Sequence, residues 1–208
     1  MSLTLILLIF TVGISALALN DPTYFYKLSH HPFTEVRQKE YYRWITSGFI
    51  HNDYMHLGIN MFVFYQFGGI VERVFTSVYG DLTGRILYLA LYIGAIVAGS
   101  IPTYFKHQNN ESYAAVGASG GVAGIMFAYA LFSPTSQILL YGIIPLYSIA
   151  WAVLYLVYEQ WAGRRGGDNI GHDAHFYGAI FGFIATAVMS PRAIPHFISA
   201  IQDLLNGG

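Results

Sequence analysis

The sequence has 208 residues, of which 55% are hydrophobic, 17% aromatic and only 10% charged. Soluble domains carry about a quarter charged residues, so this chain has too few to solvate its surface in water, and most of that surface should face lipid. The net charge of -1 does not indicate a nucleic-acid partner, and the absence of cysteine excludes disulfides and cysteine-based zinc sites. The length allows one domain, residues 1–208.

Apolar stretches predict six membrane spans, because a transmembrane helix needs roughly 17–25 mainly apolar residues. The first stretch is just long enough, and a cleaved signal peptide ending near Ala16-Leu17-Ala18 is the alternative interpretation. The expected spans are residues 3–19, 55–75, 85–104, 119–133, 138–158 and 172–189. We therefore predict a multi-pass, all-α membrane protein.

Two segments outside these spans suit the membrane interface. Asn20–Asp53 mixes charged residues with many aromatic rings, which are typical of the lipid headgroup level. Ile194–Leu205 has the pattern of a short amphipathic helix lying on the membrane.

The apolar segment Ala114–Tyr129 contains one serine, Ser119, in the sequence Gly117-Ala118-Ser119-Gly120. Only about 14 residues separate it from Ser133-Pro134, too few to cross a roughly 30 Å hydrocarbon core at 1.5 Å per residue. We expect a non-helical strand that dips into the bilayer, followed by a short helix starting at Ser119. Irregular backbone at that depth must line a cavity, so a polar, hydrated pocket is expected at the serine.

Ser119 is a candidate nucleophile, because a serine at a helix start lies beside free backbone N–H groups that can bind an oxyanion. His175 is the candidate base. The alternative interpretation of Gly-x-Ser-Gly is close helix packing without chemistry.

Small residues recur four apart on both segments, at Gly120 and Gly124 and at Gly178 and Gly182. Helices with such faces can approach closely, and His175 lies on the same face as the second pair. Close packing of the fourth and sixth helices is therefore expected to bring the imidazole to the hydroxyl of Ser119.

His56 and Asn60 are four residues apart in the second span, hence on one helical face. A polar side chain facing lipid is costly, so both should point into the bundle, where they could supply oxyanion donors. The alternative is a structural role, in which they hydrogen-bond to neighbouring helices.

Taken together, these motifs resemble the rhomboid family of intramembrane serine proteases, in order and with matching spacing over nearly the whole chain. The likeness rests on His51, His56 and Asn60, on Gly117–Gly120, on Ala174–Gly178, and on Gly68–Arg73, which is similar to the family's turn after the second helix.

The resemblance implies a six-helix bundle with a short fourth helix at the buried serine, and a Ser119–His175 dyad without a third acid. It implies an oxyanion hole from the Ser119 N–H, His56 and Asn60. Asp173, two residues before His175, should face elsewhere on its helix. Structural or pocket-forming roles are implied for Arg43, His51, Glu72, Gly117, Gly120, Gly124, Gly178 and Gly182.

Two positions depart from the family pattern. Rhomboids often carry an aromatic residue four positions after the serine, stacked on the histidine, where this chain has Ala123. What orients His175 is therefore left open. The family's Trp-Arg pair in the first loop is here Tyr42-Arg43.

Membrane orientation is in conflict between two arguments. The positive-inside rule places the first, third and fifth loops in the cytoplasm, because they carry Lys27, Arg37, Lys39, Arg43, Lys106, Arg164 and Arg165, against Arg73, Arg85 and Arg192 on the other side. The resemblance implies the opposite, with the active site opening away from the cytoplasm. We follow the resemblance, because the first loop is long and interfacial, and expect a prokaryotic inner-membrane protein.

The expected function is hydrolysis of transmembrane protein substrates near the membrane surface, without a cofactor or metal. A helix-destabilised stretch is needed because a helical peptide bond is shielded, and the resemblance adds a preference for small residues. One alternative is an inactive rhomboid-like protein that binds transmembrane helices. Another is a metal-dependent membrane protein using His172, His175, Asp173 and either His51 or His56.

Overall fold

A computed structural model of the chain describes residues 1–140, 143–165 and 171–206, and these are mostly helical. The elements in chain order are α1 (Leu3–Asn20), α2 (Pro22–Leu28), α3 (Pro32–Gln38), α4 (Arg43–Thr46), η1 (Ser47–Phe49), α5 (Tyr54–Tyr79), α6 (Asp81–His107), α7 (Ser119–Phe132), β1 (Gln137–Leu140), β2 (Ile144–Tyr147), α8 (Ser148–Arg165), α9 (His172–Met189) and α10 (Ala193–Leu205).

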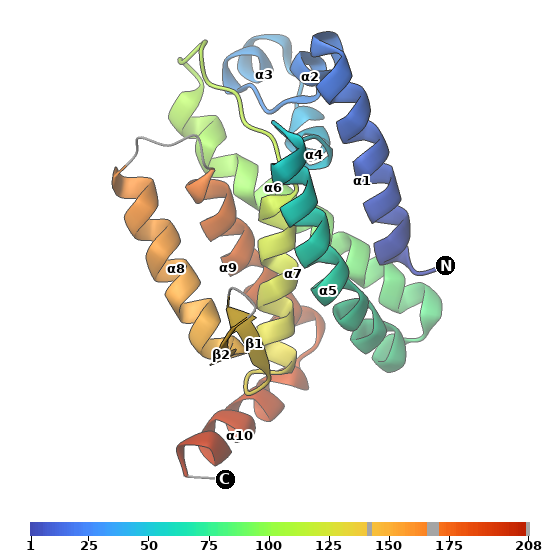
Figure 1. The fold of residues 1–208 in the computed structure, drawn as a ribbon, viewed down its shortest axis with the longest axis vertical. Helices are drawn as coiled ribbons and strands as arrows, with labels where there is room; N and C mark the ends of the chain where they lie inside the picture. The colour runs from blue at the N-terminus through green and yellow to red at the C-terminus, as the bar shows by residue number, and fades with distance from the viewer. Residues whose placement is uncertain (141–142, 166–170, 207–208) are drawn as a thin grey trace.

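Helix α7 lies in the middle of the bundle, between α5 and α8 in the view of Figure 1. It packs against α5, α6, α8 and α9, and the α7–α9 interface is the most extensive in the described chain. The short helices α2 to α4 gather at one end of the molecule, and α10 projects from the other end (Figure 1). The serine-bearing helix is therefore surrounded by the rest of the protein.

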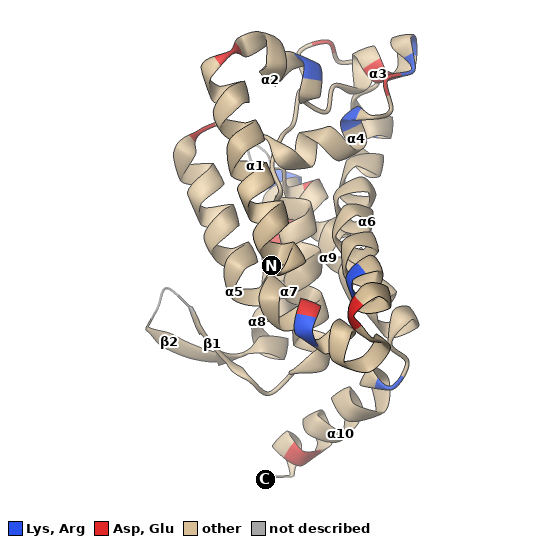
Figure 2. Cartoon of the chain, turned by 90° about the vertical axis from the view of Figure 1, so that its right-hand side faces the viewer, with Lys and Arg blue, Asp and Glu red and all other residues tan. Residues whose placement is uncertain are grey.

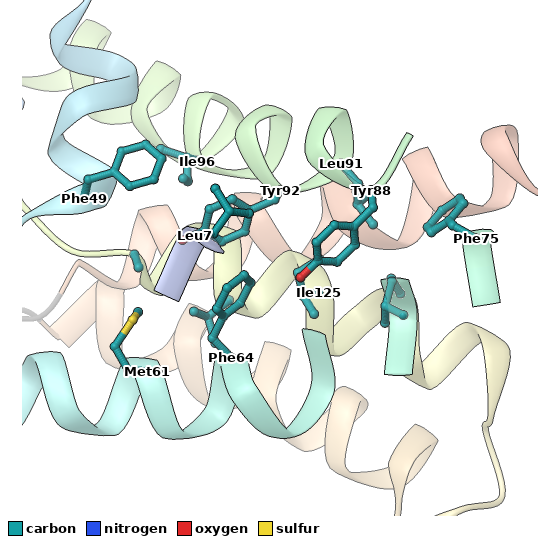
Figure 3. Close-up of a cluster of buried hydrophobic side chains, with 14 of the residues drawn as sticks. Leu7, Phe49, Met61, Phe64, Phe75, Tyr88, Leu91, Tyr92, Ile96 and Ile125 are labelled. Carbon is teal, nitrogen blue, oxygen red and sulfur yellow. The ribbon is translucent and has the colours of Figure 1, made fainter. Parts of the chain in front are cut away.

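The main hydrophobic core lies where α1, α5, α6 and α7 meet (Figure 3). Phe64, Tyr88, Leu91, Tyr92 and Ile125 are fully buried there. The rings of Phe64 and Tyr92 lie 4.7 Å apart between centroids. Aromatic side chains of this size supply much of the contact area that holds α5, α6 and α7 together.

The outer surface is apolar along most of its height. Large hydrophobic side chains are exposed on α1, α5, α6 and α8, while charged residues are few and are most numerous at the end of the molecule formed by α2 to α4 (Figure 2). By length and composition, α1 and α6 could each cross a membrane alone among the described helices. Helices α9 and α10 meet the same criterion as a pair bent by 112°.

The fifth predicted span, residues 138–158, does not form one helix. The chain first forms an antiparallel hairpin in which Pro145 of β2 lies opposite Leu139 of β1, and α8 begins only at Ser148. Proline lacks an N–H and clashes with the preceding turn inside a helix, but it is tolerated in an edge strand, which explains the late start. Residues 141 and 142 of the predicted span lie outside the described residues.

The predicted turn at Gly68–Arg73 is also wrong, because α5 continues without a break to Tyr79. A Cβ atom at Gly68 would lie 2.7 Å from the hydroxyl of Tyr88 and 2.8 Å from a methyl group of Thr4. This glycine therefore permits close packing against α6 and α1. The helix ends instead at Gly80, which has a φ of 80°.

Glu72 stabilises the start of α1 from within α5. Its buried carboxylate accepts hydrogen bonds from the N–H groups of Leu3 at 2.7 Å and Thr4 at 2.9 Å, and from the Thr4 hydroxyl at 2.7 Å. The first N–H groups of a helix have no partner within it, and an anion there also interacts favourably with the helix dipole. Glu72 thus has a structural contact far from Ser119.

Helices α7 and α9 touch through their backbones. A Cβ atom at Gly178 would overlap the carbonyl oxygen of Gly120, and one at Gly182 would overlap the backbone of Gly124. The four glycines therefore lie along one close contact, in which Gly178 and Gly182 of α9 have no room for a methyl group. This agrees with their four-residue spacing.

We predict that Gly178→Ala destabilises the protein by about 1–3 kcal/mol, because the new methyl group forces two packed backbones apart. The matched control is Gly58→Ala, since Gly58 also lies in a helix but has no atom within 4 Å of its Cβ position. That change should be neutral or stabilise by up to about 1 kcal/mol. Thermal unfolding in detergent micelles checks both, and equal midpoints for the two variants would contradict the packing argument.

Candidate active site

Ser119 is the first residue of α7, and an irregular segment leads into it. Gly117 has a φ of 131°, a conformation that residues with a side chain rarely adopt, and its N–H donates to the carbonyl of Ser47 at 2.9 Å. The segment thus turns sharply just before the serine. The first N–H groups of α7 are left without partners inside the helix, beside the serine hydroxyl.

His51 supports this turn through a hydrogen bond to Ala118. It is fully buried, and its Nε2 accepts from the N–H of Ala118 at 3.3 Å. Its Nδ1 lies 2.9 Å from the hydroxyl of Ser15, which donates to the carbonyl of Phe49. Since Nε2 accepts, Nδ1 carries the proton, and one neutral imidazole links α1 to the residue preceding Ser119.

His56 and Asn60 lie at the start of α5, where Asp53 caps the helix by accepting from the His56 N–H at 2.7 Å. The Asn60 amide donates one hydrogen to the carbonyl of His56 at 3.0 Å, which leaves its second N–H for another acceptor. A Cβ atom at Gly117 would lie 3.1 Å from His56 Nε2 and 3.6 Å from Ser119 Oγ. The imidazole and the hydroxyl therefore flank the same glycine.

His175 lies in the first turn of α9 and is held from α8. Its Nδ1 is 3.1 Å from Oε1 of Glu159, and the ring of Tyr155 lies 6.4 Å from the imidazole at an angle of 29°. The sequence pattern does not point to Glu159, because the fifth predicted span ends at residue 158 and Glu159 begins the polar stretch that follows it. The available signal was its position four residues after Tyr155, on the same face of an apolar helix.

Ser119, His175, His56 and Asn60 all line one cavity of about 960 Å³. Its remaining wall includes Trp151 and Tyr155 of α8 and is mostly apolar. Among the described residues no hydrogen bond joins Ser119 to His175. Such bonds are often long in the absence of substrate and tighten only when substrate binds.

Asp173, although next but one to His175, points away and forms an ion pair with Lys106 at 2.9 Å. Of the proposed metal ligands, His172 and His175 do come together, with Glu159 as the third group and ligand atoms within 4.8 Å of one another. His51 is held by Ser15 and Ala118 instead. The residues that could hold a metal are thus a different set from the predicted one.

Arg43 organises the first loop. Its buried guanidinium pairs with Glu40 at 2.7 Å and donates to the carbonyl groups of Tyr26 and Ser29. These contacts join α2 to α4 through backbone carbonyl groups. The planar guanidinium group of arginine can donate to several such acceptors at once. Arg43 is therefore placed to hold the loop together and makes no contact with Ser119.

The family model for the Rhomboid domain matches residues 38–192 of this chain, a range that includes every residue of the cavity. The chain belongs to the rhomboid family. The resemblance inferred from the motifs is thereby confirmed, and family membership together with the long apolar helices makes this an integral membrane protein.

Two curated rhomboid relatives are similar to it. The Rhomboid protease GlpG of Haemophilus influenzae is 30% identical over 101 residues, which cover 49% of this chain and 44% of the relative. The mitochondrial Rhomboid protein 1 of Saccharomyces cerevisiae is 28% identical over 160 residues, covering 71% of this chain and 43% of the relative. The chain thus matches less than half the length of either.

We predict that His51 makes folding stability pH-dependent. Burial, with the nearby His56 as a second cause, lowers the pKa of His51 from 6.5 to about 3. A histidine that stays neutral when folded adds stability above pH 6.5, which is lost as pH falls toward 3, by up to about 1.4 kcal/mol per pH unit. His51→Gln removes the titrating group, so its unfolding midpoint should fall less steeply over this range than that of wild type. Parallel pH profiles would contradict this role.

Proposed function

We propose that this rhomboid is an intramembrane serine endopeptidase that uses Ser119 as nucleophile and His175 as general base and acid. The single observation that supports this most is that one cavity is lined by a serine at a helix N-terminus, a histidine on a touching helix, and a histidine–asparagine pair opposite. A purely structural set of polar residues would have no reason to leave the serine hydroxyl facing an accessible cavity.

In the proposed reaction His175 Nε2 takes the Ser119 proton as the oxygen attacks the peptide carbonyl. The carbonyl electron pair moves to its oxygen, which the Ser119 N–H, His56 and the second N–H of Asn60 stabilise. The imidazolium then protonates the leaving amine as the C–N bond breaks, and water hydrolyses the acyl-enzyme in the same way. No cofactor is needed for any of these steps.

The proposed substrates are transmembrane proteins, because the protein is an integral membrane protein and the wall of the cavity is mainly apolar. The bound segment has to unwind to expose a peptide bond, and the family resemblance adds a preference for small side chains beside that bond. We further propose six membrane spans with the site opening away from the cytoplasm, in a prokaryotic inner membrane.

The second candidate function is that of an inactive rhomboid-like protein that binds transmembrane helices. Labelling with a fluorophosphonate distinguishes the two, because only an activated serine reacts. Labelling of wild type that disappears in Ser119→Ala supports the enzyme, and labelling unchanged by that substitution supports the binder. Loss of cleavage on treatment with a chelator would instead support the metal-dependent alternative.

We predict that Ser119→Ala and His175→Ala each reduce cleavage of a generic transmembrane substrate in proteoliposomes by at least about 10³-fold. The matched control is Ser77→Ala, which removes an exposed hydroxyl bonded only to the carbonyl of Val74 on the surface of α5. It should cleave like wild type. Equal cleavage by all four proteins would refute the proposed mechanism.

For the oxyanion hole, we predict that Asn60→Ala lowers kcat by about 10²–10³-fold with little change in KM, as expected for a donor that acts mainly in the transition state. Asn110→Ala, in an exposed turn after α6, is the control. A change confined to KM would show that Asn60 contributes to substrate binding instead.

A further inference from the structure

The sequence does not indicate which residue orients His175, because Ala123 stands where an aromatic side chain is expected on α7. In the structure two side chains of α8 lie against the His175 ring instead. Glu159 and Tyr155 are four residues apart, so both side chains lie on the face of α8 that packs against α9. Glu159 is buried, with only 4% of its side chain exposed.

The hydrogen bonds of Glu159 indicate which nitrogen of each neighbouring imidazole carries a proton. One carboxylate oxygen, Oε2, lies 2.6 Å from Nδ1 of His172, and the other, Oε1, lies 3.1 Å from Nδ1 of His175. A carboxylate only accepts, so both imidazoles donate through Nδ1. In a neutral His175 this leaves Nε2 unprotonated, which is the form that a general base requires.

We propose that Glu159 is a positioning residue that completes a Ser119–His175–Glu159 arrangement, holding His175 in its Nδ1–H tautomer and stabilising its imidazolium. This inference rests on the proposed protease function and deepens it. It replaces the two-residue dyad that the resemblance implied with three residues contributed by α7, α9 and α8.

In the reaction, Glu159 stays ionised throughout. The Ser119 proton moves to His175 Nε2 while the Nδ1 proton remains on the imidazole, hydrogen-bonded to Oε1. The positive charge that develops on the ring is then opposite a buried carboxylate, where the interaction is stronger than in water. The Nε2 proton later passes to the leaving amine, so the carboxylate neither gains nor loses a proton.

Other ionisable groups surround this pair among the described residues. His172 lies 6.2 Å from His175 between ring centroids, Tyr155 is one turn earlier on α8, and His56 faces the same cavity from α5. On the α6 side the Asp173 carboxylate is paired with Lys106. Glu159 is therefore the carboxylate in contact with the His175 ring.

The test uses the full chain in proteoliposomes. Glu159→Gln keeps the size of the side chain but removes the charge, and its amide can donate to Nδ1 and favour the wrong tautomer. We expect kcat to fall by about 10²–10⁴-fold. The acidic limb of the kcat/KM profile should move to lower pH by about one unit, because the imidazolium loses its anion. Glu159→Asp should recover part of both effects.

Asp173→Asn is the matched control. It also converts a carboxylate to an amide, and Asp173 is closer to His175 in sequence than Glu159 is but does not contact the His175 ring. It should leave the rate and the pH limb as in wild type. Fluorophosphonate labelling measures the fraction of active enzyme in Glu159→Gln. If that fraction falls while the acidic limb of the pH profile stays in place, Glu159 has a purely structural role and the proposal is overturned. Loss of wild-type cleavage with a chelator, restored by Zn²⁺, would overturn it in favour of a metal site.

A second measurement does not depend on how the Glu159 variants fold. Nitrogen-15 NMR of histidine-labelled wild type, with His175→Gln to assign the signal, should show His175 protonated at Nδ1 above the acidic limb. An Nε2–H tautomer there would overturn the proposal. These experiments test the protease function and the role of Glu159 separately. If Ser119→Ala still cleaves substrate, the proposed protease function is refuted. If Ser119→Ala is inactive while Glu159→Gln cleaves like wild type, only the role of Glu159 is refuted.

Discussion

The arrangement of the site depends on the direct contact between the backbones of α7 and α9. Lipid tails are as apolar as leucine, so helices in a membrane gain little from burying hydrophobic surface against each other and rely on close packing. Gly120, Gly124, Gly178 and Gly182 allow that packing by offering no side chain. The Cβ position of Gly120 lies 3.2 Å from the carbonyl oxygen of Ala174. The neighbours of Ser119 and His175 are thus fixed against each other, and these two side chains line one cavity from touching turns.

Buried polar groups then fix the remaining elements around this pair. Glu72 joins α5 to the start of α1, His51 joins α1 to the turn before Ser119, and Glu35 accepts from both Trp44 and the N–H of His31 in the first loop. An unpaired polar group in a low-dielectric interior is costly, so each pair specifies one arrangement of the elements it joins. These buried polar residues therefore fix the positions of the elements relative to one another.

The sequence predicted most successfully where a signal is local. The apolar runs gave α1 and α9 nearly to the residue, and the four-residue spacing of the glycines indicated the α7–α9 contact. It failed where the outcome depends on distant partners. Gly68 reads as a break until Tyr88 and Thr4 are known to pack against it. The apolar segment before Ser148 suggests a helix. Only Pro145, which disfavours a helix interior, indicates that a short strand forms there instead. Glu159 reads as the start of a loop because nothing near it in sequence indicates that two histidines of α9 will face it.

The substitution at Ala123 shows why a single expected contact is a poor guide to the whole site. What an imidazole base needs is a fixed ring plane and a fixed proton, and either can come from any element that packs beside it. Here α7 offers only a methyl group at that position, and α8 supplies an aromatic ring and a carboxylate one turn apart. Because Tyr155 also packs on Phe127 of α7, the ring that faces His175 is itself held by the serine-bearing helix. The orientation of the histidine is therefore set by three helices together, and the loss of one contact on α7 need not loosen it.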